Sequence, residues 1–114
     1  MNTIDTDALV ARRAAEPRLV LLEALPARYY DAAHLPGARH FPHDEVTLRA
    51  PLVVPDRATP IVVYCANRQC RNSHVAAERL VALGYGDVSV YEGGKEAWDA
   101  AGLPLERSAA VAPA

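Results

Sequence analysis

Short, nearly continuous apolar runs alternate with amphipathic segments along the chain. Runs rich in leucine, valine and isoleucine stand at residues 18–25 and 60–65, and a shorter alternating run stands at residues 87–91. Such continuous runs are typical of strands that are buried on both faces of a parallel sheet. A further brief strand is expected at residues 39–41. The pattern therefore predicts an α/β domain with a mainly parallel sheet.

The segments between these runs have the composition and spacing of helices. Residues 3–16 predict a first helix with threonine and aspartate as candidate caps, and the helix should end at Pro17. Residues 73–83 predict a second helix, because their apolar residues recur on one face. Shorter helices are expected at residues 26–33, 42–48 and 95–101, and a proline-rich loop is expected at residues 51–60.

The length of 114 residues suits a single domain with its own core. We assign residues 1–107 to this domain and expect residues 108–114 to form a disordered tail, because they carry little apolar surface to bury. A net charge of −2 and an aromatic content of 6% argue against a nucleic-acid partner. The chain has no apolar run near the ~20 residues of a membrane span and no secretory leader pattern. We therefore expect a cytoplasmic location and no membrane partner.

The chemistry of the sequence is concentrated between residues 60 and 83. The second apolar run ends on Cys65, and a polar, basic loop then leads into a helix. This order places the sulfur beside backbone N–H groups and the positive end of the helix dipole, and both favour a thiolate. Ligands also bind at the carboxyl ends of strands in open α/β sheets. Cys65 is therefore the candidate nucleophile.

A second cysteine, Cys70, lies in the same loop. A structural disulfide usually closes a longer loop, so the cysteine pair looks chemical rather than architectural. The pair also lacks the two-by-two spacing of a zinc site, and we expect neither a metal nor another cofactor. The sequence leaves open whether the two sulfur atoms come within bonding distance.

Four stretches in order resemble the rhodanese-like domain, the fold of thiosulfate sulfurtransferases. The resemblance spans residues 19–105 and implies a small three-layer α/β fold with helices on both faces of the sheet. This chain departs from the family pattern at two places. The family often has Asp-Val-Arg where this chain has Glu23-Ala24-Leu25. In the loop, Cys70 occupies the position where the family commonly has an arginine, and Arg71 follows it. The four stretches are His34-Leu35-Pro36-Gly37-Ala38, Val62-Val63-Tyr64-Cys65, Gly84-Tyr85 with Tyr91-Glu92-Gly93-Gly94 and Trp98, and Ala101-Gly102-Leu103-Pro104.

The resemblance implies that Cys65 attacks a small anionic sulfur donor such as thiosulfate and becomes a persulfide. A thiol or cyanide then accepts the sulfur, and a protein sulfur carrier is a further candidate partner. Backbone N–H groups of the loop would cradle the anion, and its arginines would stabilise the thiolate, Arg71 more than Arg68 because it stands nearer the helix. The candidate substrate-binding residues are Ala66, Asn67, Arg68, Gln69, Cys70 and Arg71.

Cys70 has two interpretations that the sequence does not separate. It is a candidate resolving thiol, which would form an internal disulfide with Cys65 and release sulfide or a reduced product. It is equally a small, polarisable residue packed under the loop. We expect Cys70 to modulate turnover rather than to act as the primary nucleophile.

Two other functions remain open. Cys65 and Arg71 have the spacing of the longer loop in cell-cycle phosphatases and some arsenate reductases, although Tyr64 replaces the histidine that commonly precedes the phosphatase cysteine. A rhodanese-like domain can also be a non-catalytic module that binds partners or senses persulfide. Two further residues are expected to have no direct chemical role. His74 is typical of a solvated first-turn residue, and Glu23 is more typical of a structural carboxylate than of a catalytic acid or base.

Overall fold

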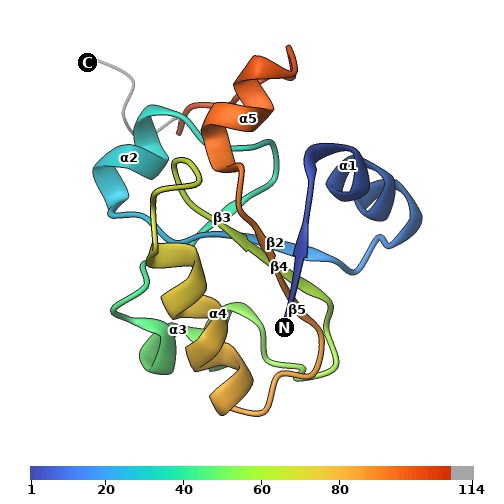
Figure 1. The fold of residues 1–114 in the computed structure, drawn as a ribbon. Helices are drawn as coiled ribbons and strands as arrows, with labels where there is room; N and C mark the ends of the chain where they lie inside the picture. The colour runs from blue at the N-terminus through green and yellow to red at the C-terminus, as the bar shows by residue number, and fades with distance from the viewer. Residues whose placement is uncertain (109–114) are drawn as a thin grey trace.

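The computed structural model describes residues 1–108 and shows a five-stranded parallel sheet between two layers of helices (Figure 1). The order across the sheet is β1-β5-β4-β2-β3, and each neighbouring pair is parallel. The predicted α/β fold with a parallel sheet is therefore confirmed. The strands are β1 (Asn2–Ile4), β2 (Val20–Glu23), β3 (Arg39–His40), β4 (Ile61–Tyr64) and β5 (Val88–Tyr91).

Helices cover both faces of the sheet, as the family resemblance implies. On one face, α3 and α4 pack over one set of strand residues, and on the other face α1 and α5 contribute Leu9 and Trp98 to a second apolar cluster. Figure 1 shows the two layers on opposite sides of the strands. The helices are α1 (Thr6–Ala15), α2 (Ala27–Ala32), α3 (Val46–Val53), α4 (Asn72–Ala82) and α5 (Gly94–Ala100).

The central strand β4 explains the continuous apolar run. Ile61 and Val63 belong to the cluster under α3 and α4, whereas Val62 and Tyr64 belong to the cluster under α1 and α5. Successive side chains of a strand point to opposite faces, so a strand covered on both faces needs an apolar residue at every position. This burial fixes β4 in the sheet and thereby fixes the start of the loop at Cys65.

The N-terminal segment corrects the prediction of a helix from residue 3. Residues 2–4 form β1, where Thr3 pairs with Val90, and α1 begins only at Thr6. Asp5 caps this helix, because the Ala8 N–H donates to Asp5 Oδ1 at 2.8 Å. β1 covers an edge of β5 that would otherwise expose unpaired backbone groups. Pairing within the sheet therefore overrides the local helix signal.

The third helix also differs from prediction. It is expected at residues 42–48 and to be followed by a loop, but α3 begins at Val46 and continues through Pro51 to Val53. A proline inside a helix removes one backbone donor and is unfavourable on its own. Here Val46, Ala50 and Val54 are all buried in the core cluster. Their burial accounts for a helix where local propensity predicts a loop.

The C-terminal residues that the structure describes return to the turn at residues 34–38. The His34 N–H donates to the Glu106 carbonyl at 2.9 Å, and the Glu106 N–H donates back to His34 at 2.8 Å. Ser108, the first residue of the predicted disordered tail, donates its N–H to the Asp31 carbonyl at 3.1 Å. The rest of that tail, residues 109–114, lies outside the described residues.

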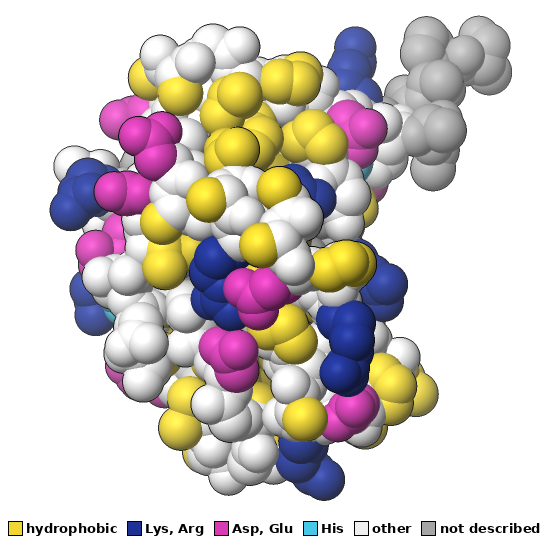
Figure 2. All heavy atoms as spheres, turned by 90° about the vertical axis from the view of Figure 1, so that its right-hand side faces the viewer, with side chains coloured by type: hydrophobic (Ala, Val, Ile, Leu, Met, Phe, Trp, Pro, Cys, Tyr) yellow, Lys and Arg dark blue, Asp and Glu magenta, His cyan; other side chains and the backbone are white. Residues whose placement is uncertain are grey.

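Charged side chains of both signs are interspersed on the face of the molecule that carries α1 (Figure 2). Arg12 of α1 lies 2.7 Å from a Glu16 oxygen and 3.3 Å from an Asp87 oxygen. Such pairing leaves no field of a single sign around this helix. Over residues 1–108, none of the helices has the length and apolar character needed to cross a membrane.

Candidate functional site

Cys65 lies where the sequence predicts it, directly after β4 and only 2% exposed. The first turn of α5 holds the start of the loop: the Lys95 N–H donates to the Cys65 carbonyl at 3.1 Å, and the Glu96 N–H donates to the Ala66 carbonyl at 3.0 Å. Gly94 permits this approach, because its φ is +59° and a Cβ there would overlap the Cys65 carbonyl oxygen. The backbone at Cys65 is therefore clamped between β4 and α5.

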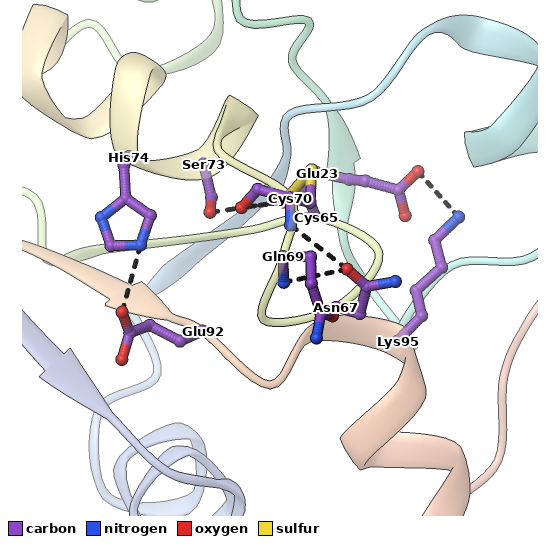
Figure 3. The surroundings of a disulfide bond; sticks show 9 residues. All are labelled: Glu23, Cys65, Asn67, Gln69, Cys70, Ser73, His74, Glu92 and Lys95. Atoms are coloured by element: carbon purple, nitrogen blue, oxygen red, sulfur yellow. Dashed lines mark hydrogen bonds and ion pairs between the residues drawn. A yellow bond between two sulfur atoms is a disulfide. The ribbon is translucent and has the colours of Figure 1, made fainter.

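Cys65 and Cys70 are joined by a disulfide (Figure 3). Their Cα atoms lie 6.4 Å apart, so the loop brings the two sulfur atoms within bonding distance, which the sequence left open. A sulfur atom in a disulfide is not a thiolate. The structure therefore shows the oxidised form of the loop, and reduction must precede any nucleophilic chemistry at Cys65.

Asn67 holds the oxidised loop from within (Figure 3). Its side-chain oxygen Oδ1 accepts the N–H of Gln69 at 3.1 Å and the N–H of Cys70 at 3.2 Å. Both N–H groups belong to the anion cradle that the sequence predicts. A bound anion would take the place of the Asn67 oxygen, which already supplies a partial negative charge at that position.

Ser73 faces Cys65 from the first turn of α4. Its side chain is buried, and its Oγ lies 3.4 Å from Cys65 Sγ. A hydroxyl group can donate a hydrogen bond to a thiolate, in addition to the favourable field of the helix N-terminus. Sequence reasoning missed this residue, and the only available signal was a serine near the predicted start of the helix.

The two arginines of the loop have different surroundings. Arg68 has a side chain that is 74% exposed, and its guanidinium lies 3.9 Å from Glu92. Arg71, which directly precedes α4, is exposed, and its side chain makes no hydrogen bond or ion pair with residues 1–108. A bound anion would therefore give Arg71 a partner that the described chain does not supply.

His74 is largely buried instead of solvated, contrary to the expectation from sequence. Its Nε2 lies 3.2 Å from Glu92 Oε2, and its side chain is only 13% exposed. Glu92 directly follows β5 and also faces Arg68. Glu92 thus links the loop, the end of β5 and the first turn of α4. Within residues 1–108, histidine, cysteine and carboxylate side chains form no group of three or more that could hold a metal ion.

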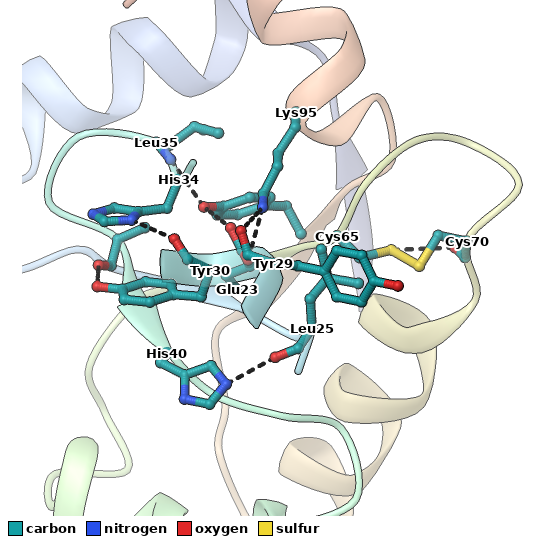
Figure 4. A network of polar contacts seen from close by, with 12 residues as sticks. Glu23, Leu25, Tyr29, Tyr30, His34, Leu35, His40, Cys65, Cys70 and Lys95 are labelled. Atoms are coloured by element: carbon teal, nitrogen blue, oxygen red, sulfur yellow. Dashed lines mark hydrogen bonds and ion pairs between the residues drawn. A yellow bond between two sulfur atoms is a disulfide. The ribbon is translucent and has the colours of Figure 1, made fainter. Parts of the chain in front are cut away.

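A buried polar network lies on the other side of the loop (Figure 4). Glu23, at the end of β2, is fully buried, with Lys95 Nζ 3.0 Å from its Oε2. Tyr64 donates its hydroxyl to Glu23 Oε1 at 2.8 Å and accepts the Leu35 N–H at 3.0 Å. Burial raises the pKa of Glu23, and contacts with Lys95 and Tyr64 oppose that rise. Glu23 therefore connects β2, β4 and α5, in agreement with a structural carboxylate.

Comparisons with known proteins identify the family of this chain. The family model of the rhodanese-like domain matches residues 6–101, so the chain belongs to the rhodanese-like domain family. A protein from Allochromatium vinosum named sulfurtransferase is 30% identical over 105 residues, which cover 92% of this chain and 94% of that protein. These similarities support an enzyme of the sulfurtransferase kind.

Longer proteins contain similar domains. The structure of a thiosulfate sulfurtransferase from Pseudomonas aeruginosa superposes with a TM-score of 0.84 at 32% identity and covers 95% of this chain, but only 20% of that protein is matched. An HTH-type transcriptional regulator from Mycobacterium tuberculosis is 31% identical over 93% of this chain and 46% of its own length. The chain thus spans less than half of either protein. A rhodanese structure from E. coli with anions matches 79% of this chain with a TM-score of 0.67 at 28% identity.

Proposed function

We propose that this chain is a sulfurtransferase that moves sulfane sulfur from thiosulfate or a persulfide donor to a thiol or to cyanide through a Cys65 persulfide. The observation that carries the proposal is the position of Cys65 after β4 and against the first turn of α4, with Ser73 Oγ 3.4 Å from its sulfur. Membership of the rhodanese-like family and similarity to a protein named sulfurtransferase support the same reaction.

The first half of the reaction requires the reduced loop. The Cys65 thiolate attacks the outer sulfur of thiosulfate, a new sulfur–sulfur bond forms, and the sulfur–sulfur bond of thiosulfate breaks. The electron pair of that bond leaves with sulfite. The N-terminus of α4 and the Ser73 hydroxyl stabilise the attacking thiolate, and Arg71 attracts the dianionic donor. No separate general base is required, because the thiolate is already the reactive species.

The second half returns Cys65 to its starting state. The acceptor thiolate attacks the outer sulfur of the persulfide, and the electron pair of the broken bond returns to Cys65 Sγ. The product is the persulfide of the acceptor, or thiocyanate when cyanide is the acceptor. Charge and electrons balance in both halves, so transfer itself needs no oxidant or reductant.

Cys70 adds a side reaction that competes with transfer. Its thiolate attacks the inner sulfur of the Cys65 persulfide, which forms the disulfide seen in the structure and releases hydrosulfide. The sulfane sulfur is reduced in this step and the two cysteines are oxidised. A dithiol reductant must then reopen the loop. Cys70 would in this way limit how long the persulfide survives.

Mass spectrometry of the intact protein tests the transfer. The protein is reduced, desalted, incubated with thiosulfate and weighed. We expect a gain of one sulfur atom that is absent in Cys65→Ala and is discharged as thiocyanate by cyanide. An unchanged mass with an intact, alkylatable thiol would contradict the proposal, and arsenate reduction and aryl phosphate hydrolysis would then be assayed.

The Cys70→Ser variant tests the side reaction. After thiosulfate loading in the absence of reductant, the parent should first gain one sulfur atom. It should then release hydrosulfide as the disulfide forms and end two hydrogen atoms lighter than the reduced protein. Cys70→Ser should retain its persulfide and release no hydrosulfide over the same time. Equal persulfide lifetimes in the two proteins would leave Cys70 without this role. The Ser108→Ala variant, which changes a half-buried serine outside the loop, serves as the control for a general effect of substitution.

A further inference from the structure

A polar pocket of about 330 Å³ adjoins the Cys65 loop. Its walls come from the end of β1, the start of α1, the segment that follows β5, and the loop itself through Arg68. β1, β5 and β4 are parallel, so their carboxyl ends, and hence the pocket and Cys65, lie at the same edge of the sheet. The polar lining residues are Thr3, Asp5, Thr6, Arg68, Tyr91 and Glu92.

The charges around this pocket favour a cationic group. Two carboxylates line it, Asp5 from the end of β1 and Glu92 from the end of β5, against the single guanidinium of Arg68. That guanidinium is 3.9 Å from Glu92 and mostly exposed. The other close partner of Glu92 is His74, whose Nε2 lies 3.2 Å away and which cancels the carboxylate charge only when the ring is protonated. Asp5 Oδ1 accepts the Ala8 N–H at the start of α1, and the negative charge of this carboxylate lies beside the pocket.

Hydroxyl groups complete the lining. Thr6 Oγ1 and Tyr91 Oη lie 2.6 Å apart and form a hydrogen-bonded pair on the pocket wall. Hydroxyl oxygens accept hydrogen bonds from an ammonium group, as carboxylates do. The anionic sulfur donor of the first half-reaction is not suited to this pocket, because the excess of carboxylates repels it. The pocket therefore suits the other substrate of the reaction.

We propose that this pocket binds the ammonium group of the sulfur acceptor, which makes the acceptor a small aminothiol. The inference rests on the proposed sulfurtransferase activity. With its ammonium between Asp5 and Glu92, the acceptor presents its thiolate past Arg68 to the outer sulfur of the Cys65 persulfide. The sulfur–sulfur bond to Cys65 breaks, the electron pair returns to Cys65 Sγ, and the acceptor leaves as its own persulfide.

The size of the pocket agrees with such a ligand. Ligand pockets commonly range from about 300 to 1,000 Å³, so this one lies at the small end of the range. Arg68 lines the pocket and belongs to the loop between Cys65 and Cys70. A short chain between ammonium and thiol would therefore bridge the two regions, whereas a bulky acceptor would not enter.

Discharge of the loaded persulfide tests the inference. The thiosulfate-loaded Cys70→Ser protein, in which the persulfide is not consumed by Cys70, is desalted and mixed with cysteamine, 2-mercaptoethanol or 3-mercaptopropionate, compared at equal thiolate concentration. These acceptors differ chiefly in bearing an ammonium, a hydroxyl or a carboxylate. We expect cysteamine to discharge the persulfide about fivefold faster than 2-mercaptoethanol. This factor corresponds to the free energy that one partly solvated ion pair contributes to binding. 3-Mercaptopropionate should be the slowest of the three.

Two variants locate the preference in the pocket. Asp5→Asn removes a carboxylate but keeps a good helix cap, and Thr3→Trp places a large side chain at the exposed pocket wall of β1. Both should reduce the advantage of cysteamine over 2-mercaptoethanol and leave discharge by cyanide unchanged. Glu78→Gln, an exposed carboxylate on α4 outside the pocket, is the matched control and should keep the full advantage.

The outcomes separate this inference from the proposed function. Failure to load with thiosulfate contradicts the thiosulfate reaction alone, and inorganic polysulfide then supplies the persulfide for the same acceptor series. Loading followed by equal discharge by all three thiols overturns the pocket assignment and leaves the transferase intact. Binding is also measured without turnover: ethanolamine should shift the backbone amide signals of residues 3–6 and 92–93 in the reduced protein. An absence of saturable shifts also overturns the assignment.

Discussion

Ser73 places its hydroxyl oxygen 3.4 Å from the sulfur of Cys65, within a buried contact between α4 and the end of β4. In the reduced protein this hydroxyl is positioned to donate a hydrogen bond to the Cys65 thiolate. Hydrogen bonds to charged groups contribute roughly 1.5–3 kcal/mol. A contribution of this size is enough to lower the pKa of a thiol by more than one unit. Ser73 is therefore the side chain from which we expect the largest effect on thiol reactivity.

The Ser73→Ala variant should make the Cys65 thiolate harder to form. We expect the midpoint of alkylation against pH to move upward by about one unit, and thiosulfate loading at neutral pH to slow about tenfold. Iodoacetamide alkylation of the reduced Cys70→Ser background isolates the signal of Cys65. Ser89→Ala, which removes another buried serine hydroxyl in β5, controls for general loss of packing. An unchanged midpoint in Ser73→Ala would show that the helix N-terminus stabilises the thiolate without the hydroxyl.

Asn67 should set the balance between the open and the disulfide-closed loop. Its Oδ1 accepts two N–H groups in the closed form, and a net gain of about 1 kcal/mol from these bonds corresponds to about a fivefold shift in the equilibrium. In a titration with reduced and oxidised glutathione, the equilibrium between disulfide and dithiol should therefore be shifted toward the dithiol in Asn67→Ala. Gln69→Ala, which truncates an exposed neighbouring side chain, should titrate like the parent. A titration of Asn67→Ala that matches the parent would argue that both forms share the Asn67 bonds.

Gly94 should be intolerant of any side chain. Its φ of +59° lies in the left-handed region, and a Cβ would overlap the carbonyl of Cys65. Gly94→Ala should destabilise the fold by about 2 kcal/mol or more and displace the loop, so that thiosulfate loading falls as well. Gly86→Ala adds the same methyl group where a Cβ meets nothing within 4 Å and should behave like the parent in urea unfolding and in loading. Equal stability of the two variants would mean that α5 moves away from the loop at little cost.

The sequence predicts those parts of the fold that local patterns determine. The apolar run ending at Tyr64 could only be buried on both faces, and this alone places Cys65 at the edge of a parallel sheet. The helix that follows is amphipathic and is found at Asn72–Ala82, within one residue of its predicted bounds. The candidate nucleophile and the helix dipole beside it were therefore accessible from sequence.

Features that depend on distant pairing were not accessible. The residues of β1 form a strand because β5 offers a free edge to them, and no local signal distinguishes them from the start of a helix. Lys95 of α5 lies 3.0 Å from Glu23 at the end of β2, although the two residues are far apart in the sequence. His74 lies 3.2 Å from Glu92, which directly follows β5 and is 18 positions away in the sequence. In each case the partner is chosen by the order of strands in the sheet, which composition and periodicity do not specify.

The carboxyl group of Glu23 should make stability depend on pH in a direction set by burial. Burial raises its pKa, and Lys95 and Tyr64 only partly oppose the rise. A carboxyl group with a raised pKa binds more protons in the folded than in the unfolded state, so its contribution to stability is complete below the unfolded pKa. That contribution is lost as pH rises through the folded pKa.

The free energy of unfolding of the parent, measured relative to Glu23→Gln, should therefore fall as pH is raised from acidic to neutral. Urea unfolding of both proteins over this range gives the difference at each pH, and Glu78→Gln, at an exposed position of α4, should show no such trend. Lys95→Met removes the opposing ammonium and should steepen the fall, because the carboxyl then loses its ion pair and keeps the weaker support of the Tyr64 hydroxyl and of His34. If the difference instead rises with pH, the ion pair with Lys95 outweighs burial, and Glu23 holds α5 against the loop as a permanent carboxylate.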